Sequence, residues 1–136
     1  MDNLVVIGVV VSRNILGYCL MSQDKVLKQG DTVNETSAVR QTFSSLLKEF
    51  DLSNDQIIIC AEHSGQYNYP LIYSCECDSY KLWLENPNLI KFYCSGLQQG
   101  KNYKLSSKQI AMYASGNADK IRLSRQEKFA LMSLKI

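Results

Sequence analysis

The chain has 136 residues, of which 46% are hydrophobic and 21% are charged, and its formal net charge is +2. This composition is typical of one folded globular domain and excludes a disordered or low-complexity chain. The longest apolar run, residues 4–11, is much shorter than the ~20 residues that cross a bilayer, and the first residues lack the basic region of a secretory signal, so we expect a cytoplasmic protein that does not associate with membranes.

The amino-terminal quarter of the chain predicts three strands that follow one another in meander order. Residues 4–12 are β-branched and almost all apolar, as in a central strand that is covered on both faces. A polar break at 13–14 leads into a second strand over 15–21, so these two strands are predicted to form a hairpin. A turn at 23–24 precedes a more polar third strand over 25–33.

A long helix is predicted next, over residues 35–50, with Asn34 as its N-cap. Its apolar residues recur at helical spacing, at Val39, Phe43, Leu46, Leu47 and Phe50. The fully apolar segment 56–61 then predicts a fourth strand, which ends at Glu62. From this point the pattern alternates between strands and helices.

The second half of the chain predicts three further helical segments and one strand. Residues 66–77 favour a short helix with a proline in its first turn, and 81–85 favour a fifth strand. Residues 87–93 predict one or two helical turns. The last clear element is a helix over 105–114, which we expect Gly116 to end.

This order of elements predicts an α/β fold in which a mixed five-stranded sheet is flanked by helices. It is also the order found in ribonuclease-H-like folds. We predict that residues 1–117 form one domain. Residues 118–136, in which Phe129 and Leu134 alternate with basic residues, predict a truncated carboxyl-terminal helix.

The cysteine content gives no sign of a disulfide framework or a zinc site. There are five cysteines, an odd number, and most lie inside apolar segments, which favours reduced, buried thiols. The pair Cys75 and Cys77 has no second pair at zinc-site spacing, and His63 is the only histidine. A structural zinc ion is therefore not expected.

Five landmarks of the sequence occur together in one known family. They are the strand IGVVVS at 7–12, Asn34 before the first long helix, AEHSGQY at 61–67, ENPNLIKFYCSG at 85–96 and KNYKLSSKQIAMYA at 101–114. In this order and spacing the chain resembles the amino-terminal RuvC-like (DEDD) domain of insertion-sequence transposases related to the Piv and MooV DNA invertases, a group that includes bridge-RNA recombinases. The resemblance covers about residues 4–115.

The resemblance implies a magnesium site of four carboxylates, three of which this chain lacks. The family is expected to place an aspartate on its first strand, a glutamate at the end of its fourth, and two aspartates at its last helix. The corresponding residues here are Val10, Glu62, Tyr103 and Ser106. One carboxylate is too few for magnesium, which is a hard cation that takes oxygen ligands, and Asp31 on the third strand is not expected to replace the missing ones. We therefore expect no metal cofactor and no catalysis of the family type.

Several residues admit both a structural and a functional reading. Glu62 is either a surviving ligand or a structural carboxylate, and His63 is better read as a polar loop residue than as a catalytic one. The tyrosines at 67, 69 and 73 could stack on bases, but their spacing favours core packing. Basic residues that either contact phosphates or form a solvated face are Lys91, Lys101, Lys104, Lys108, Lys120, Arg122 and Arg125.

Three functions remain open at this point. The first is a catalytically inactive transposase-like or recombinase-like domain that retains binding to DNA or structured RNA. The second is a protein-interaction or structural module that self-associates as a homodimer, for which an exposed apolar stripe at Phe129 and Leu134 would be suitable. The third, a working metal nuclease with relocated ligands, is the least favoured because the acids are missing.

Overall fold

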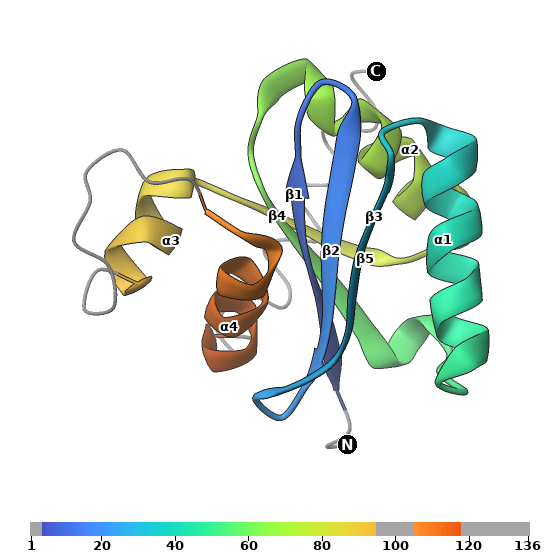
Figure 1. Cartoon of the computed structure of the whole chain (residues 1–136), viewed down its shortest axis with the longest axis horizontal. Coiled ribbons are helices and arrows are strands. Elements are labelled where there is room, and N and C mark those ends of the chain that lie inside the picture. Colours follow the sequence, from blue (N-terminus) through green and yellow to red (C-terminus); the bar gives the residue numbers. More distant parts are fainter. Residues whose placement is uncertain (1–3, 95–104, 118–136) are drawn as a thin grey trace.

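A five-stranded mixed sheet runs through the middle of the protein in a computed structural model that describes residues 4–94 and 105–117 (Figure 1). The strand order is β3-β2-β1-β4-β5. β1 and β3 pair with β2 in antiparallel fashion, whereas β4 pairs in parallel with β1 and with β5. The strands are β1 Val5–Val11, β2 Ile15–Ser22, β3 Lys25–Val33, β4 Ile57–Glu62 and β5 Lys81–Glu85. This confirms the predicted fold class.

Two helices cover each face of the sheet, as Figure 1 shows. On one face lie α1, Thr36–Glu49, and α2, Tyr69–Asp78. On the other lie α3, Pro87–Cys94, and α4, Ser107–Asn117. Two short 3-10 turns, η1 at Asn54–Gln56 and η2 at Gly65–Asn68, lead into β4 and α2. None of the described helices is long and apolar enough to cross a membrane.

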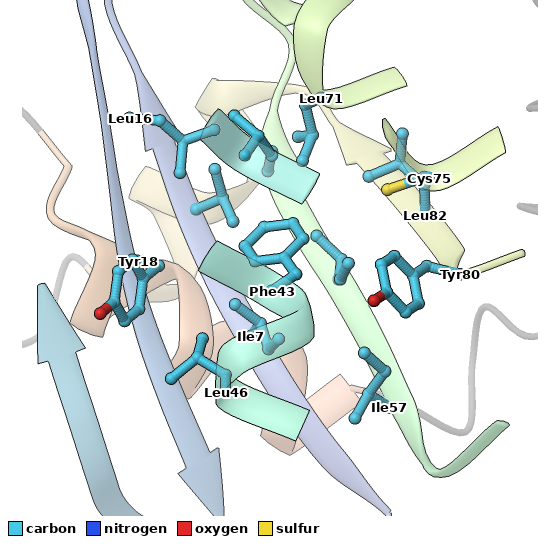
Figure 2. Close-up of a cluster of buried hydrophobic side chains, with 14 of the residues drawn as sticks. Ile7, Leu16, Tyr18, Phe43, Leu46, Ile57, Leu71, Cys75, Tyr80 and Leu82 are labelled. Atoms are coloured by element: carbon cyan, nitrogen blue, oxygen red, sulfur yellow. The ribbon is translucent and has the colours of Figure 1, made fainter. Parts of the chain in front are cut away.

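The alternation of side chains along β1 divides the core into two clusters. Val5, Ile7 and Val9 point toward α1 and α2, where they join the larger cluster. Figure 2 shows this side of the sheet, with Phe43 of α1 directed at the strands. The ring of Phe43 meets that of Tyr80 edge-on, with 6.0 Å between centroids. Side chains at even-numbered positions of β1 point instead toward α3 and α4.

α4 crosses β1 at very short range because the crossing point is a glycine. A Cβ atom on Gly8 would overlap the backbone of Ser107 and Ala111 of α4. The helix therefore rests directly on the strand, and its residues Ile110 and Ala111 are fully buried. At the far end of α4, the Ser115 hydroxyl lies 3.5 Å from a carboxylate oxygen of Asp24 in the β2–β3 turn. α4 thus runs antiparallel to β1, and its first turn lies toward the end of that strand.

Two local predictions are wrong. Gly116 does not end the last helix, because α4 continues to Asn117. The absence of a side chain at Gly116 instead makes room for Tyr93 of α3, because a Cβ at Gly116 would lie 2.5 Å from the Tyr93 hydroxyl. Asn34 is not the N-cap of α1, which is Glu35. The Asn34 amide is buried and donates to the Ser12 carbonyl at 2.8 Å and the Tyr67 carbonyl at 3.0 Å.

The three tyrosines that were expected in the core lie on the surface. Tyr67 is 38% exposed, Tyr69 is 44% exposed and Tyr73 is 36% exposed. The reason is the rotation of α2, which buries Leu71, Ile72, Ser74 and Cys75 instead. Tyr67 lies in a short 3-10 turn that precedes this helix. Because a 3-10 turn has a different number of residues per turn from an α-helix, the spacing of Tyr67, Tyr69 and Tyr73 does not place them on one helix face. The five cysteines are thiols, as expected, and four of them are buried.

Replacing Gly8 with alanine is predicted to destabilise the protein by at least about 2 kcal/mol, because the added methyl group meets helix backbone that cannot move aside. Gly17→Ala is the matched control, since the two tight contacts of a Cβ there are with side-chain atoms, at 3.2 and 3.3 Å, and the nearest backbone atom, the Gly30 carbonyl oxygen, is at 3.9 Å. It should cost about 1 kcal/mol or less. Urea unfolding followed by circular dichroism measures both, and equal losses would contradict the close helix contact.

Candidate functional site

A row of side chains crosses the sheet near the point where β1, β4 and β5 end. Gly17 of β2 pairs with Val10 of β1 and with Asp31 of β3. On the other side of β1 the parallel register pairs Val9 with Ala61 of β4, so that the next residues along, Val10 and Glu62, are neighbours, and Glu62 pairs with Glu85 of β5. Residues in register on adjacent strands point to the same face. The row therefore lies on the α3 and α4 face.

Val10 occupies the middle of this row with an apolar side chain. It is partly buried and packs against the cluster beneath α4. A Cβ on Gly17 would lie 3.2 Å from Val10 Cγ1 and 3.3 Å from Asp31 Oδ1, so both side chains extend over that glycine. Asp31 thus approaches Val10 from the β2 side, which the sequence did not indicate, because the register of β3 cannot be read from its residues.

Glu62 ends β4 beside Val10 and is partly buried. Burial raises the pKa of its carboxyl, and the positive charge of Lys91 opposes that rise. Its carbonyl accepts a hydrogen bond from the Asn68 amide at 3.2 Å, which connects the end of the strand to η2. His63, the next residue, is exposed in the connecting loop. The function of Glu62 as a surviving ligand stays a prediction.

Glu85 is a second carboxylate at this edge, and the sequence analysis gave it no role. It is only 3% exposed, and its Oε1 accepts a hydrogen bond from the Trp83 indole at 2.6 Å. The one available signal was positional, since Glu85 ends β5 just as Glu62 ends β4. The contact with Trp83 gives this carboxylate a structural partner within the core.

Ser106 precedes α4 and caps it. The Ser106 hydroxyl accepts from the Gln109 amide N–H at 3.2 Å, and the Gln109 side chain accepts from the Ser106 N–H at 2.9 Å. This reciprocal pair is a capping box, which satisfies two backbone donors that the start of a helix would leave unpaired. Ser106 thus caps α4 at a position where the resemblance implies an aspartate. Tyr103, the other position at this helix, lies outside the described residues.

Two of the seven predicted basic residues are described, and both are on this face. Lys91 of α3 is partly buried, and its charge acts on Glu62. Lys108 of α4 is exposed; burial raises the pKa of the Cys19 thiol on β2, and the positive charge of Lys108 opposes that rise. The charge of Lys91 thus acts at the end of β4 and that of Lys108 on β2, the two strands that border β1. The other five, Lys101, Lys104, Lys120, Arg122 and Arg125, lie outside the described residues.

The described carboxylates do not fit a divalent metal. Strands are spaced at about 4.8 Å, so the backbones that carry Asp31 and Glu62 are about 14 Å apart, and Val10 and Gly17 lie between them. Magnesium needs its oxygen ligands at about 2.1 Å. Over residues 4–94 and 105–117, no group of three or more histidine, cysteine, aspartate or glutamate side chains could hold a metal ion.

No protein-family model and no curated protein sequence matches the chain, but solved structures do. Thermus thermophilus RuvC superposes with a TM-score of 0.57 at 11% identity, over 88% of this chain and 98% of that one. RuvC from the same organism in complex with a Holliday junction substrate gives a TM-score of 0.54 at 10% identity, over 86% and 96%. The chain has the RuvC fold. At such low identity this similarity to RuvC, a ribonuclease-H-like protein, establishes the fold and not the activity.

The correspondence of Val10, Glu62, Tyr103 and Ser106 to four metal-binding carboxylates can be tested by introducing the three missing aspartates. The triple variant Val10→Asp, Tyr103→Asp and Ser106→Asp is expected to bind Mn²⁺ stoichiometrically, because the resemblance implies that carboxylates at these positions form one site with Glu62. Isothermal titration calorimetry measures this, and the corresponding triple asparagine variant controls for polarity without charge. A folded aspartate variant that binds no Mn²⁺ would show that the four positions do not form one site.

Proposed function

We propose that this protein is a catalytically inactive relative of the RuvC-like transposase and recombinase domains, and that it retains binding to DNA or structured RNA. The observation that carries the proposal is Val10. It places an apolar side chain on β1 where the resemblance implies an aspartate, and among the described residues of this row it lies between Glu62 and Asp31. A carboxylate set of this kind cannot assemble two-metal chemistry.

Nucleic-acid binding is supported by the fold and by the position of the described lysines. The chain resembles a RuvC solved with a Holliday junction substrate. Lys91 and Lys108 lie on the face that carries the end of β1, and neither is engaged in an ion pair within the described part of the chain. Lysine side chains at such positions can contact backbone phosphates without reading sequence. The resemblance of the sequence to the Piv and MooV group adds a mobile-element origin to this proposal.

Self-association is the second candidate, and exposed apolar side chains favour it. Tyr69 and Tyr73 form a ring pair on the outer face of α2, with centroids 6.0 Å apart. Leu89 of α3 is 51% exposed. Such groups are suitable for a contact between two copies of the chain. Phe129 and Leu134, which first suggested a homodimer, lie outside the described residues.

The purified protein is predicted to bind nucleic acid without cutting it. Fluorescence anisotropy with a labelled four-way DNA junction, duplex DNA and hairpin RNA should show binding that weakens as salt rises, because phosphate contacts release counterions. Gel assays with Mg²⁺ or Mn²⁺ should show no cleavage. Metal-dependent cleavage that Glu62→Gln abolishes would contradict the proposal and support a nuclease with relocated ligands.

Analytical ultracentrifugation separates the two candidates. A concentration-dependent dimer with no affinity for any of the three nucleic acids would favour the interaction module. In that case Tyr69→Ser combined with Tyr73→Ser should weaken the dimer, and Lys91→Gln should not.

A further inference from the structure

This edge of the sheet differs from a metal site in the group that would present positive charge to a nucleic acid. In a metal-dependent site, carboxylates hold a cation, and the cation contacts phosphate. Here no group of three or more potential ligands among the described residues could hold one. The positive charge that acts on Glu62 belongs instead to a side chain, the ammonium group of Lys91.

The position of Lys91 is fixed by a short connection from β5. Glu85, the last residue of β5, pairs with Glu62, and α3 begins two residues later at Pro87. The Asn86 side chain accepts a hydrogen bond from the Asn88 N–H at 2.8 Å, which caps this first turn. One residue before Lys91, Ile90 is fully buried. The rotation of α3 is therefore set by its core contact, and Lys91 remains partly buried on the side of the strand ends.

Lys91 is available for an external anion. Within the described part of the chain Lys91 forms no ion pair within 4.0 Å, although burial raises the pKa of Glu62 and the positive charge of Lys91 opposes that rise. This distinguishes it from Lys28 and Arg40, which pair with Glu49 and Asp78 at 2.8 and 2.9 Å. A lysine ammonium is a compact charge with three donors, suited to a phosphate oxygen.

We propose that nucleic acid is held at this end of the sheet without a divalent cation, and that the Lys91 ammonium group contacts a backbone phosphate directly. The inference rests on the nucleic-acid binding proposed above. It goes further by assigning the contact to one residue and by reversing the effect expected of Glu62. In a metal-bridged complex Glu62 is needed to hold the cation. Beside a lysine contact, its negative charge repels the phosphate.

The experiment measures binding of the labelled junction by wild type, Lys91→Gln and Glu62→Gln, in EDTA and in Mg²⁺ at matched ionic strength. Wild-type affinity should agree within about twofold between the two buffers. Lys91→Gln should weaken binding about 3- to 10-fold in both and reduce the slope of log K against log salt by about one. Glu62→Gln should bind as tightly as wild type or more tightly.

Lys81→Gln is the matched control, because it removes the same charge from the same face at the other end of the sheet. Lys81 is exposed at the start of β5, four residues before Glu85, and its removal should change affinity less than twofold. A requirement for Mg²⁺, a loss of binding in Glu62→Gln, or equal effects of Lys81→Gln and Lys91→Gln would overturn this inference alone. Absence of binding by wild type in either buffer would overturn the proposed function as well.

Discussion

The close contact between α4 and Gly8 determines how the rest of this face is arranged. Because the strand offers no side chain at the crossing point, the helix backbone rests on the sheet, and Ile110 and Ala111 are fully buried. A helix held at this distance cannot slide along the strand without its backbone meeting a β-branched neighbour such as Val6. The first turn of α4 is thereby kept beside the ends of β1 and β4, whatever side chains stand there.

That arrangement explains how the fold can persist when the carboxylates do not. Carboxylates that face one another repel and lose hydration on burial, so a metal site lowers stability until its cation is bound. Val10 avoids both costs and adds apolar contact with the cluster under α4. Ser106 caps the helix, and Glu85 accepts from Trp83. Each of these residues has a structural reason to be where it is that requires no ligand.

The sequence predicted the elements and their order because their signals are local. Alternation, apolar runs and helical spacing are carried by neighbouring residues, and β5 was placed at its observed bounds, Lys81–Glu85. Two of the errors occur where distant parts of the chain meet. Asn34 is a good N-cap by type, but its amide connects the end of β1 to η2. Gly116 is a good helix terminator by type, but the ring of Tyr93 packs where its side chain would be.

The candidate site was predictable only as far as a family pattern supplies the positions. Nothing local in VVIGVVV indicates that Val10 would neighbour Glu62, since this depends on the parallel register of β1 and β4. The approach of Asp31 over Gly17 depends in the same way on the register of β3. A strand that shifts by one residue turns every side chain to the other face, so the composition of such a row is a property of pairing and not of any one segment. The chemistry of this edge is consequently set by which side chains the sheet brings together. Here they are Val10, with Asp31 on one side and with Glu62 and Glu85 on the other, and the charge of Lys91 acts on Glu62.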